Sequence, residues 1–129
     1  MILSDVMQAV ADRAAELDGL RVYPEPPGKV DPPAFVVSYP EEWRFDQTYA
    51  RGMDYMRLPA VLVVGKVIGR EVRLAISDWC EQLKPLLESG VYAMISDLHV
   101  SMIDFDVVSI AGVDHLAGLF TMDIRGNGS

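Results

Sequence analysis

The sequence predicts an α+β fold in which two helices pack on one face of a mostly antiparallel sheet of about four strands. Residues 4–17 and 70–84 repeat apolar side chains at the spacing of an amphipathic helix. Alternating or β-branched side chains, which favour strands, fill the stretches 34–39, 53–65, 99–110 and 115–124. The chain of 129 residues suits one domain, which we expect over residues 1–125, with 126–129 as a flexible C-terminal tail.

The first element is expected to be a helix over residues 4–17. Ser4 is a plausible N-cap, and Asp5 in the first turn suits the positive end of the helix dipole. One apolar stripe is formed by Leu3, Val6, Met7, Val10, Ala14 and Leu17. Gly19 is expected to end the helix, because glycine readily takes the left-handed conformation that follows a helix. Residues 20–23 then suggest a short strand.

Residues 24–33 are half proline, so they predict a stiff surface loop, because proline lacks the amide hydrogen and fixes φ. The loop leads into the strand over 34–39. Residues 40–52 then join two strands by a connection longer than a hairpin needs, and long structured loops are often functional. Aromatic residues and arginine are enriched in interfaces, which makes contact candidates of Trp43, Phe45, Tyr49 and Arg51. The alternative is that these aromatics fold back on the core as a lid.

The strand over residues 53–65 is unusual because both of its faces are apolar. One face carries Met56, Leu58, Ala60, Leu62 and Val64, and the other carries Tyr55, Pro59, Val61 and Val63. Proline cannot donate to a β-ladder, so Pro59 indicates a sheet edge or a bulge. An exposed apolar edge invites aggregation. We therefore treat Pro59 and Val61 as candidate interface residues.

The second half of the chain is expected to contain a helix and a hairpin. Residues 70–84 have one apolar face, and Pro85 is expected to end or kink that helix. Residues 91–98 suggest one or two short helical turns. The strands over 99–110 and 115–124 are joined by "AGVD", which supplies hairpin turn chemistry.

Composition and charge exclude several classes of protein. The formal net charge of −8 argues against gripping DNA or RNA, because such binding depends on neutralising phosphates. It is compatible with a conduit that DNA passes without sticking. No run approaches the roughly 18 apolar residues of a membrane span, and the N-terminal residues are not expected to be a signal peptide. The one cysteine, Cys80, excludes an internal disulfide and fits a reducing compartment.

No strong catalytic or cofactor motif is found in the sequence. Asp104 and Asp106 share a strand face, and with His99 or His115 they form a weak candidate for a divalent metal site. A solvated strand face is the preferred interpretation, because a like-charged pair alone is no ligand set. Cys80 is interpreted as a buried inert thiol. We therefore assign no catalytic residue, cofactor or metal.

The order and spacing of several landmarks resemble the tail terminator family of long-tailed bacteriophages, in the actinobacteriophage style. The landmarks are "GLRVY", "PPAFVV", "YARGMDYMRLPAVLVVG" and, near the C-terminus, "VDHLAGLFTMDI". The resemblance extends over nearly the whole chain, and residues 70–98 are its least characteristic part.

The resemblance implies a structural role in the virion, with assembly in the host cytoplasm and no enzymatic activity. Such proteins form a homo-oligomeric ring, commonly a hexamer, on the head-proximal end of the tail tube. The implied partners are the tail tube protein below and head–tail connector proteins above, and DNA passes through the lumen without specific binding. A closed ring would also bury the apolar edge around Pro59.

Three other functions remain open at the level of sequence. The chain could be another neck component, such as a head-completion or adaptor protein. It could be a small acidic metal-dependent enzyme that uses Asp104, Asp106 and a histidine. It could also be a host-directed inhibitor that binds through residues 40–52.

Overall fold

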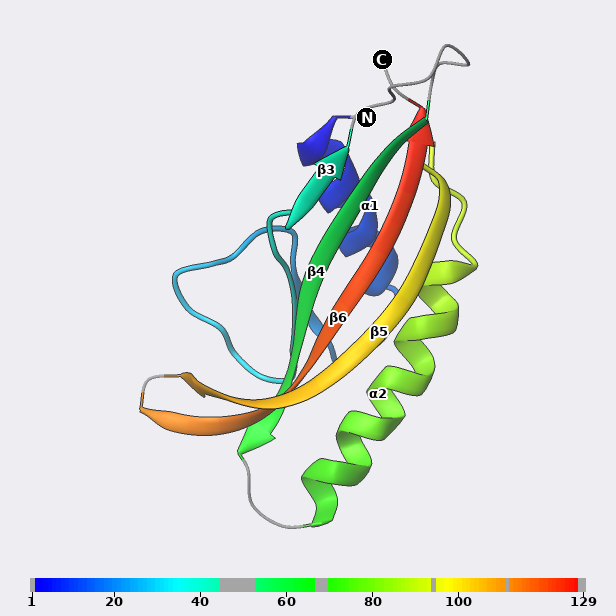
Figure 1. The fold of residues 1–129 in the computed structure, drawn as a ribbon. Coiled ribbons are helices and arrows are strands. Elements are labelled where there is room, and N and C mark those ends of the chain that lie inside the picture. The colour runs from blue at the N-terminus through cyan, green and yellow to red at the C-terminus, as the bar shows by residue number, and fades with distance from the viewer. Residues whose placement is uncertain (1, 45–52, 67–69, 94, 111, 128–129) are drawn as a thin grey trace.

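The computed structural model describes residues 2–44, 53–66, 70–93, 95–110 and 112–127. Over these residues the protein is an α+β fold with two helices and a six-stranded mixed sheet (Figure 1). The helices are α1 (Leu3–Ala14) and α2 (Arg70–Glu88). The strands are β1 (Arg21–Tyr23), β2 (Ala34–Val37), β3 (Glu42–Arg44), β4 (Met53–Lys66), β5 (Ile95–Ile110) and β6 (Val113–Asn127).

The prediction of about four, mostly antiparallel strands is wrong. The sheet runs β1-β2-β4-β6-β5, β3 pairs with β4, and the β1–β2 pair is parallel. β1 and β3 have three residues each, which is too short to show a period of two in the sequence. A parallel pair also needs a crossover connection rather than a tight turn, and the proline-rich segment 24–33 supplies it.

β4 is the central strand, so the edge expected at Pro59 is wrong. Along its length β4 pairs with β6 on one side, and with β3 and then β2 on the other. The Ser38 amide donates to the Pro59 carbonyl at 2.9 Å. In an extended residue the backbone nitrogen and the carbonyl oxygen point to the same side of the strand. The Pro59 nitrogen, which has no hydrogen to donate, therefore points toward the segment between β2 and β3. The β6 ladder loses no bond there, and the bulge of β4 lies between Val63 and Gly65.

The start of α1 differs from the predicted one. Ile2 is the N-cap, with an extended backbone and no side-chain cap, and Ser4 lies inside the helix. The helix ends at Ala14 rather than at residue 17, and Gly19 then takes a φ of +83°. The buried apolar stripe of α1 therefore determines the helix bounds more than capping does.

Helix α2 continues through Pro85 to Glu88, so of the two predicted effects of the proline, a stop or a kink, the stop is wrong. Proline lacks the amide that would bond back to the preceding turn. Its carbonyl still accepts the Ser89 amide at 3.0 Å, which continues the helical pattern beyond it. Leu83 and Leu87 on either side of the proline are fully buried, and their packing favours the continued helix.

Residues 95–98 belong to strand β5 and not to the helical turns expected over 91–98. The register of β5 shifts between Ile95 and Asp97 and again between Val100 and Met102. Ile95 and Leu98 are both buried although they are three residues apart. That spacing imitates a helix in the sequence, whereas in the structure it results from a β-bulge.

Strand β6 extends to Asn127, so the tail predicted over 126–129 begins too early. Gly126 lies opposite Asp54 on β4 and Ile95 on β5, within the sheet. Helix α1 lies behind the sheet in Figure 1, and both helices contribute buried side chains to one apolar core on the sheet. Phe35 and Phe120 meet edge to face there, with ring centroids 5.4 Å apart. No helix of the described ranges is long and apolar enough to cross a bilayer.

Candidate functional site

The sheet face opposite the helices, called here the open face, carries a group of charged side chains at one end. Residues that pair across strands project on the same face of a sheet. The register places Tyr55 opposite both Arg44 and Arg125, and Asp123 opposite His99. The pairing of four strands therefore brings together polar side chains that are separated in the sequence.

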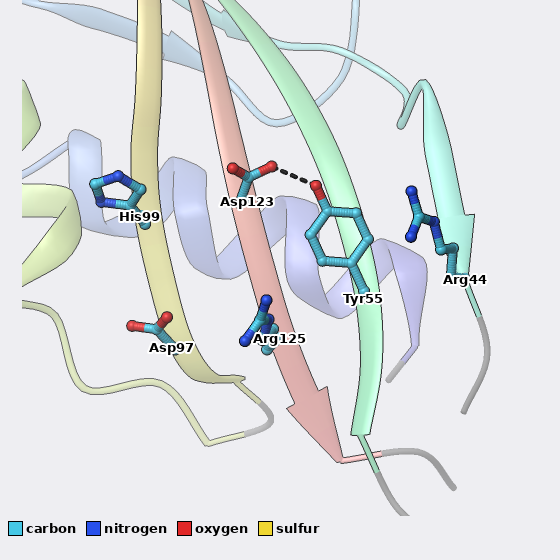
Figure 2. Close-up of a pocket in the computed structure, with 6 residues that line it drawn as sticks. All are labelled: Arg44, Tyr55, Asp97, His99, Asp123 and Arg125. Atoms are coloured by element: carbon cyan, nitrogen blue, oxygen red, sulfur yellow. Dashed lines mark hydrogen bonds between the residues drawn. The ribbon is translucent and has the colours of Figure 1, made fainter. Parts of the chain in front are cut away.

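Side chains of the open face line a hollow of about 500 Å³ (Figure 2). The lining residues are Arg44, Tyr55, Asp97, His99, Asp123 and Arg125. Figure 2 shows helix α1 behind the sheet, on the far side from this hollow. The hollow is thus built by the register of β3, β4, β6 and β5 alone.

Asp123 is the centre of the hydrogen bonding at this site. The Tyr55 hydroxyl donates to Asp123 Oδ1 at 2.5 Å, and Arg57 Nε lies 3.6 Å from the same oxygen. Partial burial opposes the charge on Asp123, but the Tyr55 and Ser101 hydroxyls and Arg57 hold its pKa below the ordinary value. The hydrogen bond to Asp123, together with burial, raises the pKa of Tyr55. Asp123 is therefore ionised and already partnered at neutral pH.

The cations at this end of the open face are more exposed than the anions that pair with them. Arg44 pairs with Glu42, and their side chains are 67% and 33% exposed. Arg57 and Asp123 are 41% and 28% exposed. Arg125 is also exposed, and it forms no ion pair with a residue in the described ranges. We call Arg44, Arg57 and Arg125 the arginine patch; the exposed carboxylate of Asp97 lies beside it, opposite Arg125.

The arginine patch is also held by contacts with tyrosine. The Arg44 guanidinium lies over the Tyr55 ring, 5.3 Å from its centroid, in a cation–π contact. The Tyr55 hydroxyl lies 3.3 Å from an Arg57 nitrogen. Tyr55 therefore orders two guanidinium groups while its own hydroxyl is bonded to Asp123.

Glu88 at the end of α2 covers part of the outer edge of β5. Its carboxylate accepts the Val100 amide at 2.9 Å and the Lys84 ammonium at 2.7 Å, and His99 Nδ1 lies 2.9 Å from it. Burial opposes the charge, but the bonds from Lys84 and Val100 lower the pKa of Glu88. A charged side chain at a sheet edge blocks unwanted strand pairing.

The other end of the open face carries a hairpin that we call the arm, residues 102–117 of β5 and β6. Its tip points away from α2 and beyond the main body of the sheet (Figure 1). Large apolar side chains are exposed on it: Met102, Phe105, Val107 and Val113. Its charged residues are Asp104, Asp106 and Asp114, and no lysine or arginine occurs between Lys84 and Arg125. The arm is therefore apolar and anionic.

The candidate metal ligands do not form a metal site in the described part of the chain. Asp104 and Asp106 are exposed on β5. His115 is buried with Nδ1 2.9 Å from the Val113 carbonyl oxygen, and His99 contacts Glu88 instead. Within the described ranges, no three His, Cys, Asp or Glu side chains are grouped to hold a metal ion.

Cys80 lies on the buried face of α2, and burial raises the pKa of its thiol to about 11. The thiol is therefore protonated at neutral pH, which is the form that does not attack as a nucleophile. Phe105 and Leu116 of the arm lie with Cys80 around a second hollow of about 400 Å³.

The predicted interface residues are separated by the structure. Trp43 lies on β3, half-buried against the core cluster and opposite Met56. Pro59 and Val61 lie half-buried on the open face in the middle of β4. Three other candidates of that hypothesis, Phe45, Tyr49 and Arg51, lie outside the described residues. The proposed contact role of the 40–52 segment stays a prediction.

Sequence reasoning missed the arginine patch. The sequence did contain a signal, because residues two apart on a strand share one face of the sheet. Tyr55 and Arg57 are two apart, and so are Asp123 and Arg125. Only the register of β4 on β6 shows that these pairs lie side by side. The apolar second face predicted for this strand is thus apolar around Val61 and polar at its Tyr55 end.

The chemistry of the open face suits an ionic contact with another protein surface. The carboxylates of Glu42, Glu88 and Asp123 already accept hydrogen bonds within the chain. Arg44 and Arg57 are the more exposed members of their ion pairs. Arg125 and Asp97 are exposed and make no ion pair within the described ranges, so these groups also remain accessible to a partner. No protein-family model matches this sequence, and a search of curated proteins finds no match.

Proposed function

We propose that this protein is a bacteriophage tail terminator, which forms a hexameric ring on the head-proximal end of the tail tube. The ring covers the surface that the next tube ring would join, and so ends tube polymerisation. Its opposite side meets the head–tail connector proteins. The protein acts in the virion after assembly in the host cytoplasm, and DNA passes through the lumen without specific binding.

The observation that carries the proposal is a long sheet with one face that no helix of the described chain covers. The outer strands β1, β3 and β5 also present edges, and the arm exposes apolar side chains. Such surfaces are a risk for a lone subunit and are protected by neighbours in a closed ring. The sequence resemblance to tail terminators, described above, supports the same function.

The mechanism is occupation of a surface, so it needs no cofactor and no turnover. About one ring acts per tail. If the site on each ring spans adjacent tube subunits, linked contacts favour tube ends over free tube monomers, because each further contact becomes intramolecular. This preference for ends allows the protein to stop elongation without consuming the pool of tube protein.

The test is tail length. Deletion of the gene should give particles without heads and with tails of uncontrolled, excessive length, measured by negative-stain electron microscopy. Purified protein added to polymerising tube protein should block further elongation at a ratio of about one ring per tube. Averaged images of the head-proximal tail end should show a six-fold ring of this protein.

A different result would support the adaptor alternative. If deletion leaves tails of normal length that fail to join heads, the capping role is wrong. Absence of any protein of this mass at the head-proximal tail end would exclude both functions.

A further inference from the structure

We propose that the anionic arm of one copy of the chain binds the arginine patch of a second copy. The two surfaces lie at opposite ends of the open face. The charged residues of the arm are all acidic, whereas the patch exposes three guanidinium groups beside the exposed carboxylate of Asp97. The inference rests on the proposed ring and assigns the contact between its neighbouring subunits.

The arm and the arginine patch of one copy are too far apart to pair within that copy. On β5, Asp106 in the arm and Asp97 beside the patch pair with two residues of β6. Asp106 lies opposite Ala117, and Asp97 lies opposite Arg125. Eight residues separate the two positions along β6, which is roughly 27 Å at about 3.4 Å per residue. This separation greatly exceeds the Debye length of about 8 Å at physiological salt. Both surfaces are therefore left for contacts with another molecule.

The charges on both surfaces favour a head-to-tail contact. Asp104 and Asp114 make no ion pair with any residue that the structure describes. In the arginine patch, each paired cation is more exposed than its carboxylate partner. A symmetric arm-to-arm contact would place aspartates against aspartates, which is unfavourable. The contact is therefore heterologous, and a heterologous contact that closes produces a ring.

Apolar and aromatic side chains lie beside the charges on both surfaces. Met102 is exposed next to Asp104 on the open face of the arm, and its cross-strand partner is Thr121. Tyr55 lies in the middle of the arginine patch. A methionine thioether packs well on an aromatic ring. The contact thus combines a small apolar centre with a charged rim, which is the usual arrangement of a protein interface.

The experiment is a charge exchange between two variants. The arm variant is Asp104→Arg with Asp106→Arg, and the patch variant is Arg44→Glu with Arg125→Glu. Each variant alone should self-associate at least tenfold more weakly than the wild type, measured by sedimentation velocity and native mass spectrometry. A 1:1 mixture should regain association, because the reversed arm of one variant meets the reversed patch of the other.

Matched controls change the same charge elsewhere on the exposed surface. They are Asp18→Arg with Asp78→Arg, and Lys29→Glu with Arg70→Glu. These variants should associate like the wild type. Circular dichroism and thermal melting establish that each variant is folded. If the arm variant does not fold, Asp104→Asn with Asp106→Asn replaces it and should weaken association at least threefold.

Three results would overturn the proposal. They are a wild type that stays monomeric up to about millimolar concentration, folded variants whose mixture stays monomeric, and controls that weaken association as much as the arm and patch variants do. Tube elongation is measured on the same proteins. If the mixture associates but the wild type does not stop elongation, the capping function fails and the arm contact stands. If the wild type stops elongation but the mixture stays monomeric, the arm contact fails and capping stands.

Discussion

Glu88 shows how much one side chain contributes to the end of α2. It holds the Val100 amide at the sheet edge, the Lys84 ammonium one helical turn away, and the His99 ring. Nothing in the sequence distinguishes Glu88 from the exposed Glu81 on the same helix. The difference arises because α2 continues past Pro85 and places Glu88 beside β5, which local sequence patterns did not predict.

Stability should depend on the charge of Glu88. Its pKa is lower in the folded protein, because the bonds from Lys84 and Val100 outweigh the opposing effect of burial. The charge of Glu88 therefore stabilises the fold fully at pH values above the pKa of the carboxyl group in the unfolded chain, which is about 4.3. This stabilisation is lost as the pH falls through the lower pKa that Glu88 has in the folded protein. Glu88→Gln should lower the free energy of unfolding by about 1 kcal/mol at pH 7, and by less near pH 3. Urea unfolding at several pH values measures this difference.

The control for this prediction is Glu81→Gln, which changes an exposed carboxylate that makes no hydrogen bond within the described ranges. It should leave stability within about 0.5 kcal/mol of the wild type. A Glu88→Gln deficit that stays constant from pH 7 to pH 3 would show that the charge of Glu88 is not the cause.

At the level of elements, long periodic segments were predictable and short or irregular ones were not. The alternating side chains of β4 and β6 indicated strands, because one face of each is buried. The three-residue strand β3 and the bulged start of β5 gave no such signal, since their pairing depends on partners distant in sequence. For the same reason the arginine patch was not predicted. Its residues lie in the 40–52 connection, in the strand over 53–65 and directly after the strand over 115–124, and only strand pairing brings them together.

Two glycines of the β5–β6 hairpin should respond differently to alanine. Gly112 in the turn has a φ of +78°, which disfavours any residue with a Cβ, so Gly112→Ala should cost about 1 kcal/mol. A Cβ on Gly118 would meet Ile103 Cγ2 at 3.5 Å, an ordinary contact. Gly118→Ala should therefore be neutral, or should stabilise by up to about 1 kcal/mol. Thermal unfolding of both variants measures the contrast, and equal losses would contradict it.

For the whole molecule, the sequence predicted the α+β class and the charge but not the distribution of that charge. The net charge of −8 hides a surface with an anionic arm at one end and an arginine patch at the other. Composition cannot show this separation, because Arg44, Arg57 and Arg125 come together only through strand pairing.

The whole protein should not bind duplex DNA at physiological salt. Its 19 acidic side chains outnumber its 11 basic ones, and the arginine patch contains only three guanidinium groups. Binding by release of counterions needs several phosphate contacts at once. Fluorescence anisotropy of a labelled duplex should stay unchanged up to about 100 µM protein in 150 mM salt. Binding at micromolar concentration would contradict a passive DNA conduit.

The long ladder between β4 and β6 also has a mechanical consequence. The two strands pair from one end of the sheet to the other, and their hydrogen bonds lie perpendicular to the strand direction. A force applied along the strands pulls on all these bonds together, in shear. A force applied across them would open the bonds one at a time, as in unzipping. The subunit is therefore stiffest along its long strands, so a load between the two ends of the open face is resisted by the whole ladder.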